Sequence, residues 1–498
     1  MSLRLNRESS VVEMSPEDFR KAGYEVVDRI AEFLKSLADK PVAPGKTSKE
    51  MRNVLGNSSL LTEGTDSVKL LNEAADLLFK YSTFNGHPKF WGYITSSATP
   101  IGALADLLAA AVNPNVGAAE LSLAATEIEA QTTRWIAEMI GYPKDCGGIM
   151  VSGGNMANFI GFLAARKAKA KWNIREEGLN NKPLIIYAST ETHTWVQKAA
   201  DLFGMGTNSI HWIEVDGKQR MKMDDLKTKI KVDKENGLYP FIVVGNAGSV
   251  GTGATDPLGK ISDVCKENNL WFHADGAYGA VAAMLPDASD DLTGIRNADS
   301  IALDPHKWLY APLEAGCTLV KNPEHLLDAF SYHPEYYRFE GDEDEKPINY
   351  YEHGLQNSRG FRALKVWLGL RQAGKNGYIK MMSEDIELAE YLFKLISSES
   401  ELEAVTHNLS ITTFRYVPAD LKNQSKEKQE YLNELNEELL ARLQNSGEAY
   451  ISNAIVKGKF VLRACIVNFR TTKSDIESLP AIVKKFGKQV DKEKRSSK

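Results

Sequence analysis

From residue 147 to residue 320 the chain alternates short apolar runs with helical stretches, and this alternation constrains the fold more than any other feature. The runs are continuously apolar, as in strands that are covered on both faces. We expect strands at 148–151, 184–188, 209–215, 240–245, 270–274, 299–303 and 315–320. Strands that alternate with helices form mostly parallel sheets, so the sequence predicts an α/β fold.

The preceding segment reads as helical. Ser15-Pro16-Glu17-Asp18 combines an N-cap serine, a first-turn proline and two acids, which is typical of a helix start. This helix should run over 15–39, and others are expected at 66–81, 101–112 and 126–140. The 101–112 helix is nearly all apolar, so we expect it to be buried on most sides. The apolar helices exceed what one α/β domain needs to cover its sheet, which predicts a homodimer.

The region after residue 330 divides into a long loop and a second α+β unit. The loop, 331–358, contains the acidic stretch Glu340 to Pro347, and a loop of this length is usually functional or disordered. Helices are expected at 360–374, 383–397 and 425–445, and strands near 409–416, 449–455 and 459–466. The basic residues from Lys484 to Lys498 are expected to form a solvated helix end and a frayed tail. We therefore divide the chain into a helical segment (1–110), a large α/β domain (111–375) and a small C-terminal α+β domain (376–498).

Composition excludes several classes of protein. The 498 residues carry a formal net charge of -6, which argues against nucleic-acid binding. No apolar run reaches the length of a membrane helix, so we expect no membrane partner. The cysteines, Cys146, Cys265, Cys317 and Cys465, show neither a C-x-x-C spacing nor a neighbouring histidine pair, which argues against a disulfide framework and a metal site. A reducing cytoplasm is the simplest location.

Two strand ends carry residues whose meaning is open when each is taken alone. Asp304-Pro305-His306-Lys307 follows the 299–303 strand. It could be a basic surface turn, or it could hold a lysine in a cleft for Schiff-base chemistry. Gly153-Gly154-Asn155 lies between a strand and a helix. It could be a plain tight turn, or its backbone N–H groups could bind an anion.

Two further strand ends are ambiguous in the same way. Asp275 could cap a helix or pair with a pyridinium nitrogen, and His193 could be a helix cap or stack on a flat aromatic ligand. Ligands of such sheets bind at the carboxyl ends of the strands, where all of these residues lie. A phosphate cradle, a stacking ring, an acid and a lysine together are what pyridoxal 5'-phosphate requires. The combination predicts this cofactor.

The residues then become recognisable as those of a family. From about Ser15 to Arg470 the chain resembles the group II pyridoxal-phosphate-dependent decarboxylases, and among them the aromatic-L-amino-acid decarboxylases. The matching motifs are His87-Pro88-Lys89-Phe90-Trp91-Gly92-Tyr93, Ala125-Thr126-Glu127-Ile128-Glu129, Gly153-Gly154-Asn155, His193, His273-Ala274-Asp275-Gly276-Ala277-Tyr278, Asp304-Pro305-His306-Lys307-Trp308 and Phe361-Arg362-Ala363-Leu364-Lys365-Val366-Trp367. The resemblance implies the type I, aspartate-aminotransferase-like fold and a homodimer with its site at the subunit interface.

The resemblance also implies a role for each site residue. Lys307 forms the Schiff base, Asp275 pairs with the ring nitrogen, Ala277 packs on the ring, His193 stacks on the other face, and Gly154 and Asn155 bind the phosphate with His306 close by. Tyr350, in the long loop, matches the tyrosine that returns a proton to the substrate carbon, although the adjacent Tyr351 could take this register. The implied substrate pocket contains Trp91, Tyr93, Ile94, Thr95, Asn115 and Gly117.

Some positions depart from the family pattern. Asp304 stands where the animal enzymes have asparagine, and a carboxylate near a phosphate must point away or pair with a cation. Bulk is lost around Asn115 and Gly117, and Ile94-Thr95 replaces an aromatic-proline pair. The sequence therefore predicts decarboxylation of an L-amino acid, of the aromatic type. The alternatives are a non-aromatic substrate, an aldehyde synthase and an inactive scaffold with this fold.

Overall fold

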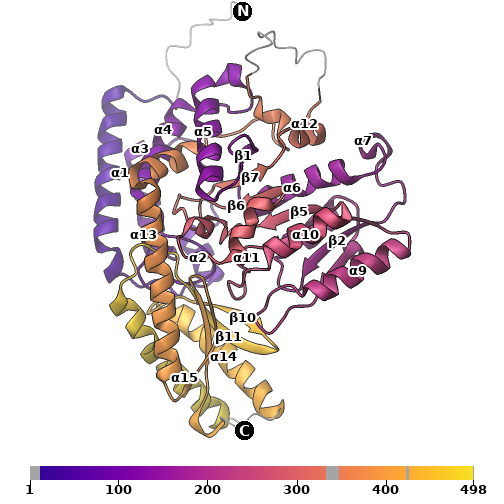
Figure 1. The fold of residues 1–498 in the computed structure, drawn as a ribbon. Coiled ribbons are helices and arrows are strands. Elements are labelled where there is room, and N and C mark those ends of the chain that lie inside the picture. Colours follow the sequence, from indigo (N-terminus) through magenta and orange to yellow (C-terminus); the bar gives the residue numbers. More distant parts are fainter. Residues whose placement is uncertain (1–11, 333–346, 422–425, 497–498) are drawn as a thin grey trace, which may run out of the picture.

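The computed structural model describes residues 12–332, 347–421 and 426–496. A seven-stranded sheet forms its centre, in the order β1-β7-β6-β5-β4-β2-β3 (Figure 1). The strands are β1 (Gly147–Val151), β2 (Leu184–Ser189), β3 (Ile210–Ile213), β4 (Tyr239–Asn246), β5 (Trp271–Asp275), β6 (Ser300–Leu303) and β7 (Gly316–Val320). Strands β2 to β6 pair in parallel, and β7 lies antiparallel between β1 and β6. All seven predicted strands and the α/β fold are confirmed.

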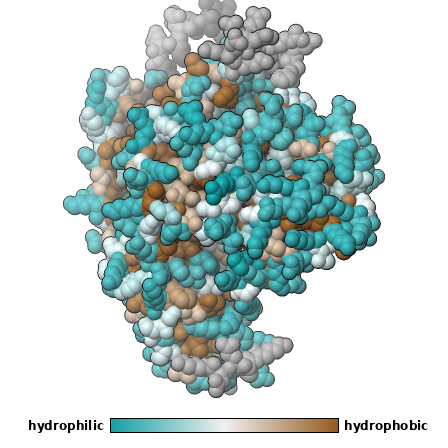
Figure 2. All heavy atoms as spheres, in the orientation of Figure 1, coloured by the Kyte–Doolittle hydropathy of each residue, from teal (hydrophilic) through white to brown (hydrophobic). Residues whose placement is uncertain are grey.

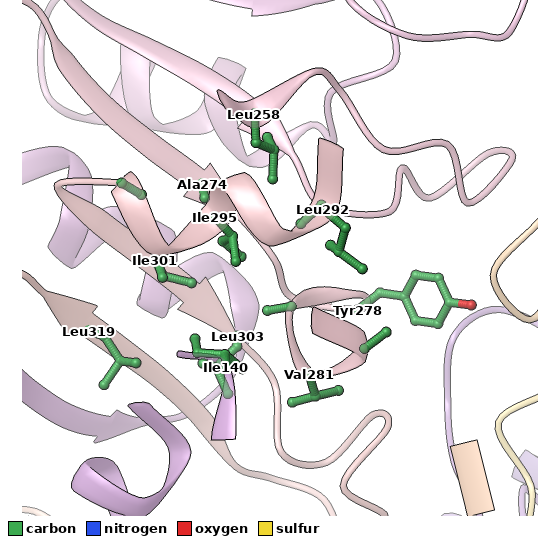
Figure 3. Close-up of a cluster of buried hydrophobic side chains, with 14 of the residues drawn as sticks. Ile140, Leu258, Ala274, Tyr278, Val281, Leu292, Ile295, Ile301, Leu303 and Leu319 are labelled. Carbon is green, nitrogen blue, oxygen red and sulfur yellow. The ribbon is translucent and has the colours of Figure 1, made fainter. Parts of the chain in front are cut away.

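Helices cover both faces of this sheet, which explains the continuous apolar runs. One apolar cluster packs α5 (Leu123–Met139), α9 (Met223–Glu235) and α10 (Leu258–Asn268) on one face. Figure 3 shows part of it, with Leu258 above Ala274 and Ile301 of the sheet. A second cluster packs α6 (Gly154–Lys169), α8 (Trp195–Leu202) and α12 (Glu324–Phe330) on the other face. The short helices α7 (Ile174–Glu177) and α11 (Asp290–Thr293) lie in connections.

The N-terminal part is helical as predicted, but one expectation about it is wrong. Its helices are α1 (Pro16–Ser36), α2 (Ser48–Leu55), α3 (Ser67–Tyr81) and α4 (Pro100–Val112). Only Gly102 and Ala105 of α4 are buried, whereas Leu107 and Leu108 are 53% and 58% exposed. The reason is that α4 packs on α13 (Ala363–Ser398) along one side. Nothing in the described part of this chain covers its other side.

The C-terminal unit contains more structure than the sequence pattern predicted. Its elements are the second half of α13, then β8 (Leu402–Asn408), β9 (Ile411–Tyr416), α14 (Lys426–Ser446), β10 (Ser452–Val456), β11 (Lys459–Cys465) and α15 (Lys473–Ser496), with an antiparallel sheet in the order β10-β11-β9-β8. Strand β8 was not expected. Helix α15 confirms the expected helix end, but it extends to Ser496 and buries Val483, Phe486 and Val490, so little of the expected frayed tail is found among the described residues. The proposed boundary at 375/376 adjoins Gly374 (φ 62), where α13 is interrupted, and the domain division stays a prediction.

A fully buried ion pair joins several segments of the α/β unit that contains the seven-stranded sheet. Arg359 and Glu129 are 1% and 0% exposed, and the guanidinium lies 2.5 Å from Glu129 Oε1. The same guanidinium donates to the carbonyl oxygens of Val116 and Met150, and the Met150 amide donates to Glu129. Four segments, around Val116, Glu129, Met150 and Arg359, therefore share one charged centre.

Removing one partner of this pair leaves the other charge buried and uncompensated. We expect Arg359→Leu to lower the free energy of unfolding by about 3–5 kcal/mol, read as a fall in the thermal unfolding midpoint. Arg296→Leu, which changes an exposed arginine, is the control. The double variant Glu129→Leu/Arg359→Leu should lose less than Arg359→Leu. An Arg359→Leu midpoint equal to that of the control would contradict the role of the pair.

Candidate active site

The carboxyl ends of the parallel strands open into a cavity of about 800 Å³. Strand register sets what meets there, since Asn246 of β4 lies opposite Asp275 of β5, and Asp275 lies opposite Ala302 of β6. Most of the predicted site residues line this cavity, namely Gly154, Asn155, His193, Asp275, Ala277 and Lys307 of the cofactor set and Tyr93, Ile94 and Thr95 of the substrate set.

Asp275 is fixed by two donors. Trp195 Nε1 donates to its Oδ2 at 2.7 Å, and the Ala277 amide donates to Oδ1 at 3.2 Å. The residue is only 8% exposed, at the rim of the cavity. A carboxylate accepts more than one hydrogen bond at each oxygen, so Asp275 can also accept a bond from a protonated ring nitrogen.

Lys307 is paired with the residue that departs from the family pattern. Its Nζ lies 3.1 Å from Asp304 Oδ2, and the Asp304 side chain is 2% exposed. Within the described ranges, Asp304 Oδ1 has no hydrogen-bond partner. The expectation that this carboxylate needs a cation is met by Lys307 itself, which leaves the anion-binding role to other groups.

The glycines before α6 form a cradle that suits a phosphate. Gly153 is the N-cap with φ 133, and no side chain caps the helix, so its first N–H groups are open to an anion. A Cβ on Gly154 would lie 2.7 Å from Asp304 Oδ2, so only glycine fits there. His306 lines an adjoining hollow with Gly153 to Asn155, and its Nδ1 is bound to the Ala315 backbone.

His193 follows β2 and faces the same cavity. Burial lowers the pKa of its imidazole, partly opposed by the Asp275 carboxylate, which raises it. The ring is therefore neutral near pH 7, as suits stacking on a flat aromatic group.

Several predicted residues are not brought to the cavity of the described chain. Trp91 is fully buried in the C-terminal core, and its Nε1 donates to Thr471. Asn115 turns its amide oxygen to the backbone of Gly117 and Arg359. These positions serve local structure within the chain.

Tyr350, expected in the long loop as the residue that returns a proton to the substrate carbon, lies in the apolar core. It begins a short 3-10 turn (Tyr350–Glu352) and is 1% exposed within the apolar cluster beside α6. The Arg359 guanidinium lies 4.7 Å from its ring centroid, and burial raises the pKa of its phenol well above the usual value of 10. The placement does not support proton donation into the cavity. The acidic part of the loop lies almost entirely in 333–346, outside the described residues.

Sequence reasoning missed Arg463 of β11, which also lines the cavity. It is 3% exposed, its Nε donates to Ser452 Oγ at 3.1 Å, and another of its nitrogens donates to the Val250 carbonyl. A buried guanidinium at a cavity is a natural site for a carboxylate. The only signal in the sequence was an arginine inside the apolar run 460–465, and a strand pattern alone does not indicate a site.

Comparison with known proteins decides the family. The model of the pyridoxal-dependent decarboxylase conserved domain matches residues 49–417. The chain belongs to this family. It is 35% identical over 483 residues to an aromatic-L-amino-acid decarboxylase of Bacillus atrophaeus, covering 97% of this chain and 98% of that protein. It is 29% identical to a phenylacetaldehyde synthase of a Rosa hybrid cultivar, covering 91% of this chain and 90% of that protein.

A solved structure with the same fold is that of Oryza sativa TDC with PLP and tryptamine. Its TM-score is 0.89 at 25% identity, with 96% of this chain and 99% of that chain covered. This pyridoxal-dependent decarboxylase is thus an amino-acid carboxy-lyase that uses pyridoxal 5'-phosphate. The cradle, Asp275 and Lys307 fit the phosphate, ring nitrogen and aldehyde of that cofactor.

His273, behind the site, gives the decarboxylase a testable acid sensitivity. It is fully buried, with Nδ1 2.7 Å from Ser300 Oγ and Nε2 2.7 Å from Asn158 Oδ1. Burial lowers the pKa of His273 from 6.5 to about 4. Between these pH values the unfolded chain binds a proton that the folded chain does not. The free energy of unfolding therefore keeps its full His273 contribution above pH 6.5 and loses it as the pH falls towards 4.

We expect His273→Asn to flatten this part of the pH profile. The wild type should lose about 3 kcal/mol more of unfolding free energy between pH 6.5 and 4 than the variant, since each pKa unit corresponds to about 1.4 kcal/mol. Denaturant unfolding at a series of pH values measures it. Parallel profiles for the two proteins would show that His273 is not the group responsible.

Proposed function

We propose that this decarboxylase converts an aromatic L-amino acid to its amine and carbon dioxide. The observation that carries the proposal is the meeting of Lys307, Asp275 and the Gly154 cradle in one cavity that also contains Arg463. The similarity to an aromatic-L-amino-acid decarboxylase over 97% of the chain supports the aromatic class. The cavity of about 800 Å³ is large enough for a cofactor and an aromatic side chain together.

Each group has a role that its surroundings support. Bound pyridoxal 5'-phosphate supplies an electron sink for the bond that breaks. The amides of Gly154 and Asn155 hold its phosphate at the start of α6, and Asp275, fixed by Trp195, keeps a proton on the ring nitrogen. Lys307 provides the amine that holds the cofactor, and Asp304 receives that amine as an ammonium when it is free.

The remaining cavity groups act on the substrate. Ala277 and neutral His193 present faces for the two sides of the flat ring. Arg463 can orient a carboxylate, because its guanidinium is held by Ser452 and Val250 and is otherwise desolvated.

The aldehyde synthases among the relatives make product identity the deciding test. We expect the wild type, assayed with a panel of L-amino acids, to release amine and carbon dioxide from aromatic members without consuming oxygen. Lys307→Ala should still fold but lose turnover and the borohydride-sensitive visible band. Turnover at near wild-type rate in this variant would reject Lys307. Aldehyde with hydrogen peroxide as the main products would favour a synthase.

We also propose a homodimer. In the part of the chain that the structure describes, α3 and α4 leave apolar side chains exposed, including Leu70, Leu71, Leu104, Leu107 and Leu108. Figure 2 shows apolar groups among polar ones over the N-terminal helices. No helix among the described residues is long and apolar enough to cross a membrane. Since Asn115 and Gly117 directly follow α4, a second copy packed there could supply them to a neighbouring cavity. A cytoplasmic location stays a prediction.

Charges on α4 should separate the two copies. We expect Leu107→Glu/Leu108→Glu to give a monomer of reduced activity, because two carboxylates cannot be buried unpaired in an apolar interface. Multi-angle light scattering measures the mass. Leu202→Glu, on an exposed position of α8, should remain dimeric. A wild type that is an active monomer at assay concentration would overturn the proposal.

A further inference from the structure

Three carboxylates line the cavity, and two of them have partners. Asp275 accepts from Trp195 and the Ala277 amide, and Asp304 pairs with Lys307. Glu191 is different, because no hydrogen bond or ion pair joins it to any other residue that the structure describes. The cofactor chemistry assigned above leaves it without a role.

Glu191 is nevertheless held in a defined place. It follows β2 by two residues, and its Oε2 would lie 3.1 Å from a Cβ placed on Gly251. The carboxylate therefore packs against the 248–251 turn after β4, where glycine leaves room for it. Val250 of the same turn accepts from Arg463, so Glu191 and the guanidinium border one stretch of backbone.

The polar neighbours of Glu191 in the cavity already have hydrogen-bond partners other than Glu191. The Asn246 amide nitrogen donates to Ser189, Thr192 and Asp256. Ser249 is bound to Thr252. Burial raises the pKa of Glu191, which shows that its carboxylate has lost solvation without gaining a compensating donor. A ligand that brings a donor would restore the missing interaction.

We propose that Glu191 is a specificity-determining residue that accepts a hydrogen bond from the substrate side chain. The substrates that fit are aromatic amino acids with a ring donor, either a phenolic O–H or an indole N–H. Phenylalanine lacks the donor, and an acidic side chain meets a like charge. This inference rests on the proposed decarboxylation of aromatic amino acids and narrows its substrate class.

The test compares kcat/KM for tyrosine and phenylalanine in the cofactor-loaded enzyme and its variants. The wild type should prefer tyrosine by about tenfold or more, since a hydrogen bond to a charged group contributes about 1.5–3 kcal/mol. Glu191→Leu should bring the ratio within about threefold, and Glu191→Gln, which keeps a neutral acceptor, should give an intermediate ratio. Gly251→Ala, which displaces the carboxylate without removing it, should also lower the ratio. Thr190→Val, at another cavity position, is the control.

The possible outcomes distinguish failure of the Glu191 inference from failure of the proposed decarboxylase function. If the wild type turns over aromatic amino acids but does not distinguish tyrosine from phenylalanine, Glu191 has no such role and the decarboxylase assignment stands. A wild-type preference that survives intact in both Glu191→Leu and Gly251→Ala overturns the inference in the same way. If no aromatic amino acid is decarboxylated, the proposed function and the inference fail together.

Discussion

The site depends first on the register of the parallel strands. Because β4, β5 and β6 run in the same direction, their carboxyl ends meet at one edge of the sheet, with Asn246, Asp275 and Ala302 side by side. A slip of one residue would turn Asp275 to the opposite face of the sheet. The apolar layers on both faces, which include Ala274 on one side and Val244 on the other, fix this register. The chemistry of the rim is thus a consequence of packing on the two faces.

The turn that carries Lys307 is held in place by contacts that Trp308 and Tyr310 make outside the cavity. Trp308 stacks on Tyr278 at 4.9 Å, and the indole donates to Asp385 of α13 at 2.9 Å. Tyr310 donates to the same carboxylate at 2.7 Å. Asp385 is buried, and a buried acid is costly unless such donors compensate for lost water. The helix that leads into the C-terminal unit therefore helps to position the lysine, although it does not line the cavity.

The sequence predicted what depends on local pattern, and it failed where distant contacts decide. Continuous apolar runs identified every strand of the large sheet, and strand-end residues identified the charged and glycine-rich groups at the rim of the cavity. Strand β8, which is only partly buried beyond Leu402, carried no such pattern. Tyr350 was misplaced because its anchor, the Glu129–Arg359 pair, joins residues 230 positions apart. Arg463 was overlooked because a strand in a different unit brings it to the site. Neither contact leaves a periodic trace in the sequence.

Two exposed features of the described chain have one economical explanation. His193 is exposed at the cavity, and decarboxylation of this kind gains from a site that is closed to water. Leu104, Leu107 and Leu108 of α4 are exposed, and clustered apolar side chains on a surface commonly mark a contact with another protein. The Asn115–Gly117 turn connects the two features, because it follows α4 directly and its Asn115 side chain is used within its own chain to fix the turn. A surface that buries α4 would therefore deliver a preformed turn in a fixed orientation. In the homodimer proposed above, the same contact would remove the leucines from water and close the cavity of the neighbouring copy.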